Sequence, residues 1–169
     1  MLRYVVKAVV LFLAYILQYT IGNNIALFGI SPSFILVTLL VFTMLTQGYD
    51  AIFYALSAGV ATDLLWGRVF GLNTLLFLGI ALVCYFLNQH IYKKNLLIMC
   101  GYAFAFTALY EFLYYILAFA MWGGGSSFAF ITLRLVLPKC CYNAVLTLAL
   151  FPFISWLDAL TKDKWGQRV

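Results

Sequence analysis

The chain has 169 residues, of which 66% are hydrophobic and 9% are charged. Soluble domains average about 45–50% apolar and about 25% charged residues, and a soluble fold of this size could not hide so much apolar surface. The composition excludes a cytosolic enzyme, a disordered chain and a secreted disulfide scaffold. It predicts an all-α integral membrane protein. The apolar runs are continuous rather than alternating, so we do not expect a transmembrane β-barrel.

The length of the chain fits a bundle of six transmembrane helices in one membrane domain, residues 1–169. A bilayer core about 30 Å thick needs about 20 helical residues, so six spans use ~120 residues and eight do not fit. The expected spans are approximately 4–28, 33–47, 51–66, 72–91, 95–122 and 137–160. We expect residues 128–137 to be interfacial or re-entrant. The alternative is one long helix kinked at Pro138.

The basic residues predict the orientation of this bundle. With six spans both termini lie on one side of the membrane, and that side carries seven bases against three on the other. The seven are Arg3, Lys7, Lys93, Lys94, Lys162, Lys164 and Arg168, and the three are Arg68, Arg134 and Lys139. The positive-inside rule then places the N- and C-termini in the cytoplasm. The net charge of +5 indicates topology and lipid-headgroup contact, not nucleic-acid binding.

Two acids lie inside predicted spans, where charge is costly and often functional. They are Asp63 and Glu111, and both fall toward the outer end of their spans. Arg134 and Lys139 are expected on the same side, so we predict an intramembrane polar cluster of these four residues. Two interpretations stay open: internal ion pairs that set the register of the helices, or a surface that binds a partner or ligand.

The third expected span carries a second pattern, with small residues recurring every four positions. The repeat comprises Ala51, Ala55, Gly59, Asp63, Gly67 and Gly71. Small residues at this spacing let another helix approach closely, either inside the bundle or from a partner. The candidate packing or partner interface is Ala55, Gly59, Asp63, Gly67, Gly71 and Asn73. In both cases we expect this span at the packed centre, with Asp63 facing protein.

Motifs typical of enzymes are not found in the sequence. There is no HExxH, GxSxG, Walker A or suitably spaced pair of aspartates. The four cysteines lie in apolar runs without metal-site or CxxC spacing, which indicates small buried or lipid-facing residues. We therefore expect no enzymatic activity, no metal and no cofactor.

Two stretches resemble the rod shape-determining MreD family. Residues 59–75, GVATDLLWGRVFGLNTL, resemble the glycine-spaced third span of that family, its aspartate and the entry to the next helix. Residues 137–144, LPKCCYNA, resemble the Pro-x-x-x-Tyr-Asn opening of the last span through Pro138, Tyr142 and Asn143. The later aromatic-proline pair of that span corresponds to Phe151-Pro152. The likeness covers nearly the whole chain.

This resemblance implies a non-enzymatic, multi-pass scaffold of the cell-elongation machinery in the bacterial cytoplasmic (inner) membrane. The direct partner that it implies is MreC, a single-span protein with a periplasmic domain. The MreB filament, the RodA glycosyltransferase and the elongation transpeptidase are implied as further members of the complex. Membrane lipid is the other expected contact. Such a scaffold maintains rod shape by supporting lateral peptidoglycan synthesis.

The MreD family is also similar in fold to the substrate-binding subunits of energy-coupling-factor vitamin transporters. Such a subunit is the alternative function. It predicts a small-molecule pocket near Asp63, Glu111 and Arg134, and small-residue contact surfaces on the first span. The first span carries bulky Leu, Phe and Tyr residues without a clear small-xxx-small pattern, which weighs against this alternative.

Overall fold

Every element of the described chain is helical, as expected from the composition. The computed structural model describes residues 2–22, 30–46, 50–67, 69–87, 96–122 and 132–163. The six α-helices are α1 (Leu2–Leu17), α2 (Phe34–Leu45), α3 (Asp50–Trp66), α4 (Leu72–Leu87), α5 (Leu96–Trp122) and α7 (Leu137–Asp163). Two short π-helical turns accompany them: Gln18–Gly22 continues α1, and Thr132–Val136 leads into α7.

The helices differ widely in length. Within the described ranges, Leu96–Met121 of α5 and the stretch Arg134–Ala159 are long and apolar enough to cross a membrane. By contrast, α2 has 12 residues, which rise only about 18 Å, less than the ~30 Å of a bilayer core. The two long helices support a membrane protein, while the six-span topology and the cytoplasmic termini stay predictions.

The centre of the bundle is α2, not the third predicted span. All residues from Phe34 to Met44 are buried, and α2 contacts α1, α3, α4, α5 and α7. Its sequence, FILVTLLVFTML, has no polar face, and a helix that is apolar all round is one that becomes buried on all sides. The expectation that α3 forms the centre is therefore wrong: its small residues mark a close approach to one neighbour, and its other side is exposed.

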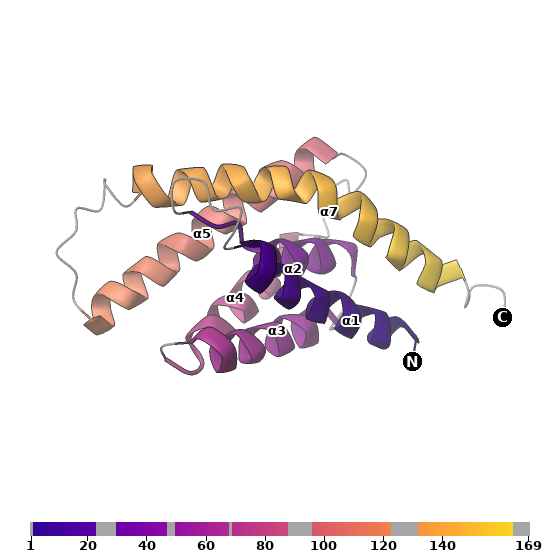
Figure 1. Cartoon of the computed structure of the whole chain (residues 1–169), viewed down its shortest axis with the longest axis horizontal. Coiled ribbons are helices and arrows are strands. Elements are labelled where there is room, and N and C mark those ends of the chain that lie inside the picture. Colours follow the sequence, from indigo (N-terminus) through magenta and orange to yellow (C-terminus); the bar gives the residue numbers. More distant parts are fainter. Residues whose placement is uncertain are drawn as a thin grey trace.

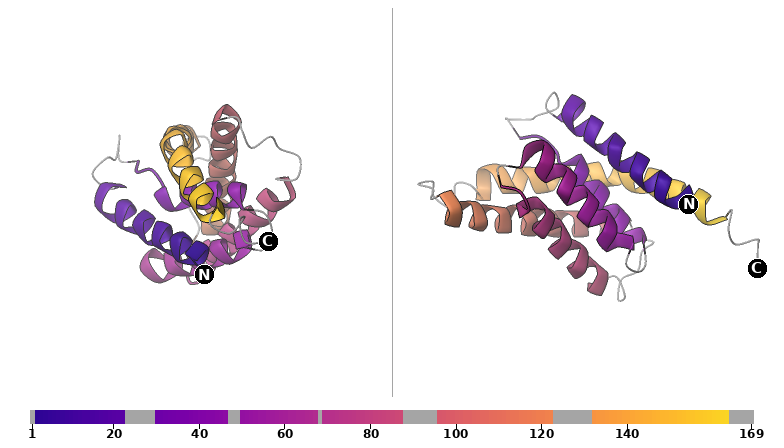
Figure 2. Two further views of the ribbon diagram at one scale, coloured as in Figure 1. Left: turned by 90° about the vertical axis from the view of Figure 1, so that its right-hand side faces the viewer. Right: turned by 90° about the horizontal axis from the view of Figure 1, so that it is seen from below.

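The two long helices lie together on one side of the molecule. α7 runs along this side with α5 beside it, α3 lies on the opposite side, and α2 lies between them (Figure 1). The start of α1 and the end of α7 lie at the same end of the molecule (Figures 1 and 2).

The last helix is longer and bends elsewhere than expected. Thr132–Val136 runs directly into α7, so residues 132–163 form one helical stretch; residues 128–131 lie outside the described residues, and the interfacial placement of 128–137 stays a prediction. Pro152 lies inside α7, and the helix bends part-way along its length (Figure 1). A proline inside a helix removes one backbone hydrogen bond and clashes with the preceding turn. The bend therefore belongs to Pro152 and not to Pro138.

Candidate functional site

The carboxylate of Asp63 caps the N-terminus of α4. It accepts hydrogen bonds from three backbone N–H groups, those of Gly71 (3.0 Å), Asn73 (3.0 Å) and Thr74 (2.9 Å). It also accepts them from the Asn73 side-chain amide (2.9 Å) and the Thr74 hydroxyl (2.5 Å). The first N–H groups of a helix have no partner within it, and the helix dipole favours negative charge there. Asp63, near the end of α3, thus supplies the hydrogen-bond acceptors that the first N–H groups of α4 lack.

Three glycines of the small-residue repeat make this geometry possible. At Gly59 an added Cβ would collide with the backbone of Thr74, where α3 and α4 approach each other. At Gly67 it would lie 2.5 Å from the carbonyl oxygen of Asp63. Gly71 has a φ of +96°, in the left-handed region that glycine adopts without strain. Ala55, the remaining small residue of the predicted interface, is fully buried.

A hydrogen bond extends this site to α5. The hydroxyl of Tyr110 donates to Oδ1 of Asn73 at 2.7 Å. The Tyr110 ring lies 5.5 Å from the ring of Phe77 on α4 and 6.0 Å from that of Tyr114, centroid to centroid. We call Asp63, Asn73, Thr74 and Tyr110 the Asp63 network. It connects α3, α4 and α5 through polar groups that are mostly buried.

A second set of polar side chains holds the chain where it enters α2. Oε1 of Gln18 accepts from the Phe34 N–H at 2.8 Å, and Nε2 of Gln18 donates to the Pro32 carbonyl at 3.0 Å. The Ser33 hydroxyl accepts weakly from the Leu36 N–H at 3.4 Å and caps α2. Residues 31–33 have no regular structure, so their backbone groups need side-chain partners in an apolar surrounding.

Asn143 of the Tyr-Asn motif belongs to this second set. Its side chain is fully buried. Its Oδ1 accepts from the Ser33 N–H at 2.9 Å, and its Nδ2 donates to the Thr107 hydroxyl at 3.3 Å. We call Gln18, Ser33, Thr107 and Asn143 the Asn143 network. It joins the π-helical turn after α1 to α2, α5 and α7. The other motif residues, Pro138 and Tyr142, are exposed and half-buried respectively.

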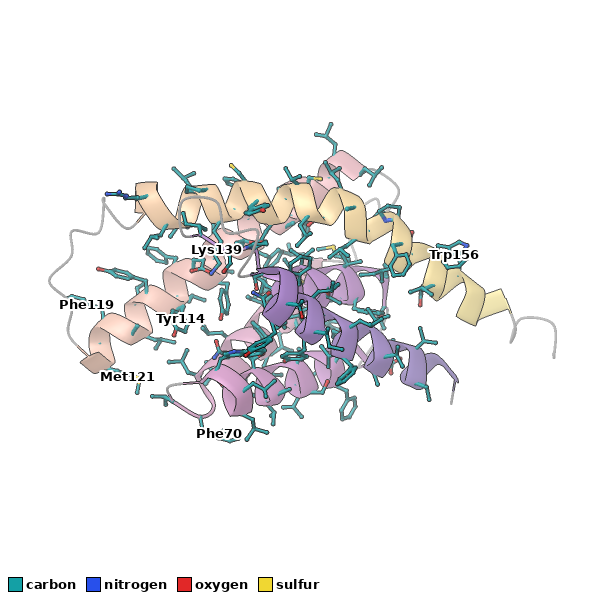
Figure 3. The ribbon with its side chains drawn as sticks, in the orientation of Figure 1. Phe70, Tyr114, Phe119, Met121, Lys139 and Trp156 are labelled. Atoms are coloured by element: carbon teal, nitrogen blue, oxygen red, sulfur yellow. The ribbon has the colours of Figure 1, made fainter. Side chains whose placement is uncertain are left out.

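Of the four charged residues expected in one cluster, the structure pairs two, Glu111 and Lys139, whereas the hydrogen bonds of Asp63 go to the start of α4. Nζ of Lys139 is 2.6 Å from Oε1 of Glu111, an ion pair between α7 and α5. Figure 3 shows Lys139 on the side of α7 turned toward α5. The five donors around Asp63 are uncharged, and Arg134 is exposed in the turn before α7. The prediction groups these four residues because they are expected at a similar depth in the bilayer, but a similar depth does not determine which helices are neighbours.

Sequence reasoning missed several residues that the structure brings together. Gln18 and Thr107 are uncharged polar residues in apolar runs, and their position there is the only sign of a role that the sequence offers. The hydroxyl of Tyr110, in a span rich in aromatic residues, is expected from the sequence to donate to Glu111 and instead donates to Asn73. Lys7, read from the sequence as a marker of the cytoplasmic side, pairs with Asp50 of α3 at 3.2 Å. Within the described ranges no three His, Cys, Asp or Glu side chains gather as metal ligands would.

The comparison with protein families gives one match. A family model described as rod shape-determining protein MreD matches residues 1–159. No curated protein and no solved structure matches the chain. The matched range contains both polar networks and all six α-helices except the last residues of α7. It gives no support to a vitamin-transporter subunit or to the fold similarity expected with such subunits.

Proposed function

Since the chain belongs to the MreD family of rod shape-determining proteins, we propose that it is a scaffold of the elongation machinery in the bacterial inner membrane. In this proposal it binds MreC directly and supports lateral peptidoglycan synthesis within a complex that includes MreB, RodA and the elongation transpeptidase. The observation that carries the proposal is the family match over residues 1–159. The family itself is one of structural, shape-determining proteins.

The two polar networks support a scaffold rather than a mobile carrier. Asp63 is 4% exposed and receives five hydrogen bonds, and Asn143 is fully buried. A fully satisfied buried polar network rigidifies the structure around it. Asp63 and Asn143 therefore stabilise the packing of the helices. Contact with a partner is expected on the apolar outer surface.

The groove between α4 and α5 is our candidate surface for the MreC helix. Its volume is about 570 Å³. It is lined by Val83, Leu87, Ile98, Gly101, Tyr102, Ala105, Phe106 and Leu109. Gly101 and Ala105 lie one helical turn apart, and a Cβ added at Gly101 would have no atom within 4 Å. In lipid, helices associate by close packing at small residues. The repeat around Gly59, in contrast, is already occupied by α4.

Two glycine variants test this proposal. A Cβ added at Gly101 or at Gly79 would meet open space, but only Gly101 lines the groove. We expect Gly101→Leu to abolish co-purification of MreC and to round the cells of a rod-shaped host that depends on this chain. Gly79→Leu should leave both unchanged. Full MreC binding by Gly101→Leu would exclude this groove, and no MreC binding by the unaltered chain would exclude the proposed function.

A further inference from the structure

A cavity lies between α1 and α3, and none of its lining residues belongs to the Asp63 network or the Asn143 network. Two side-chain bridges join these helices. At one end Nζ of Lys7 lies 3.2 Å from Oδ2 of Asp50. At the other end the Tyr15 hydroxyl donates to the Ala58 carbonyl at 2.6 Å and lies 2.8 Å from the Thr62 hydroxyl. The cavity between the bridges has a volume of about 380 Å³, within the ~300–1,000 Å³ typical of small-molecule sites.

The lining of the cavity is polar at one end and apolar along its walls. Lys7 is 6% exposed and forms the charged end together with Asp50. Tyr54, one turn further along α3, is also 6% exposed and lines the cavity. In the described structure its hydroxyl has no hydrogen-bond partner, and burying such a group is unfavourable unless a ligand satisfies it. Phe12 and Phe53 line the walls of the cavity, and both side chains are mostly exposed on the outer surface of the described structure.

The length of the cavity selects the kind of occupant. Lys7 and Tyr15 are eight residues apart on α1, which corresponds to about 12 Å of helix. Half of a ~30 Å bilayer core is about 15 Å, the depth of one leaflet. A partner helix would need an uninterrupted groove through both leaflets, but the Tyr15 bridge interrupts this one and separates the cavity from a second hollow of about 370 Å³ beside Ile16 and Trp66. An acyl chain of a lipid in one leaflet matches the observed length.

The charges at the polar end select the headgroup. We propose that this cavity binds a phospholipid with a primary-amine headgroup, phosphatidylethanolamine. Lys7 donates to the phosphate, the headgroup ammonium donates to Asp50, and Tyr54 donates to a phosphate or ester oxygen. One acyl chain packs between Phe12 and Phe53. This site lies apart from the α4–α5 groove and does not depend on MreC.

Other headgroups match the pair of charges less well. A purely anionic headgroup such as phosphatidylglycerol meets Lys7 but also the carboxylate of Asp50. The quaternary ammonium of phosphatidylcholine has no N–H to donate. Charge-assisted hydrogen bonds are the stronger ones, so both differences should be measurable.

The first experiment measures the unfolding temperature of the delipidated full chain in detergent with each of the three lipids added. We expect phosphatidylethanolamine to raise it most. Each variant is compared with itself in the absence of lipid. Lys7→Gln should weaken the response to every phospholipid, roughly tenfold in concentration. Asp50→Asn should reverse the preference from phosphatidylethanolamine to phosphatidylglycerol. Equal responses of the unaltered chain to all three lipids would overturn the proposal, as would an unchanged preference in Asp50→Asn.

A second variant keeps the proposal testable if the charge variants do not fold. Tyr54→Phe preserves the ring, which packs against Phe42 at a centroid distance of 4.7 Å. Without lipid it should unfold at the same or a higher temperature than the unaltered chain, because it removes an unpartnered hydroxyl. With phosphatidylethanolamine it should gain less. Tyr19→Phe, at an exposed tyrosine outside this cavity, is the matched control. An undiminished gain in Tyr54→Phe, or crosslinking of an MreC helix to Phe12→Cys in lipid-saturated protein, would overturn the lipid assignment.

Discussion

Oδ1 of Asp63 accepts two hydrogen bonds from Asn73, one from its backbone N–H at 3.0 Å and one from its side-chain amide at 2.9 Å. The same amide group uses its oxygen to accept from Tyr110. A residue at the end of α3 is thus connected through one side chain to the middle of α5. This relationship makes the aspartate part of the structural framework of the bundle.

Asp63→Asn should destabilise the bundle. The new amide NH₂ would face N–H and hydroxyl donors, and the start of α4 would lose its negative charge. We expect a loss of about 2–4 kcal/mol in the free energy of unfolding, because hydrogen bonds to charged groups and buried networks give the larger effects. Titration with SDS in mixed micelles measures it. A change below about 0.5 kcal/mol, the usual size for surface substitutions, would contradict the role of Asp63.

Tyr110→Phe should cost about 1 kcal/mol, the typical net contribution of one hydrogen bond. The ring would keep its place between Phe77 and Tyr114. The same titration, repeated with Asn73→Ala and with both changes together, isolates the contribution of the pair. Tyr19→Phe, at an exposed position, serves as the control. If the two changes were additive, the hydrogen bond between Tyr110 and Asn73 would contribute nothing to stability.

One added methyl group should lower the stability of the protein at Gly59 of α3 but not at Gly79 of α4. Gly59→Ala places a Cβ against the backbone of Thr74, so we expect a loss of about 1–3 kcal/mol, as for other overpacked sites. Gly79→Ala meets open space, and we expect no loss of stability. Thermal unfolding of the two variants side by side tests this contrast. Equal stability of both would mean that α3 and α4 do not approach each other so closely.

The ion pair between Glu111 and Lys139 should be recoverable by exchanging its charges. Each of Glu111→Lys and Lys139→Glu leaves two like charges at the interface of α5 and α7, and each should destabilise the chain. The double exchange should restore most of the loss, with a coupling of about 1–3 kcal/mol for contacting residues. Measuring unfolding of all four proteins completes the cycle. A double variant no more stable than its worse parent would show that the pair is not coupled.

Some parts of this structure follow from sequence patterns and others do not, for identifiable reasons. An acid in an apolar run marked Asp63 as important, and the glycine spacing marked the face that α4 approaches. Neither pattern indicated the hydrogen bonds to Gly71, Asn73 and Thr74. These bonds depend on the conformation of the connection between α3 and α4. Likewise, the Tyr-Asn motif marked Asn143, but its partner Ser33 is distant in sequence.

The central position of α2 and the bend of α7 show the same limit. Burial on all sides depends on how many neighbours a helix acquires, and hydropathy measures only its own composition. The small residues of α3 indicate close packing against one neighbouring helix, but they do not indicate that α3 lies at the centre of the bundle. Pro138 and Pro152 both lie in a helical pattern. Pro138 is the second residue of α7, whereas Pro152 lies in its interior.

The hydrogen bond from Ser33 to Asn143 has a consequence for how the protein is made. Its two residues are 110 positions apart, so the entry to α2 is synthesised long before α7 supplies its acceptor. Until then the backbone N–H of Ser33, at the start of α2, lacks this partner. Biogenesis is therefore completed by the last helix, and a chain that stops after α5 would present membrane proteases with an open core.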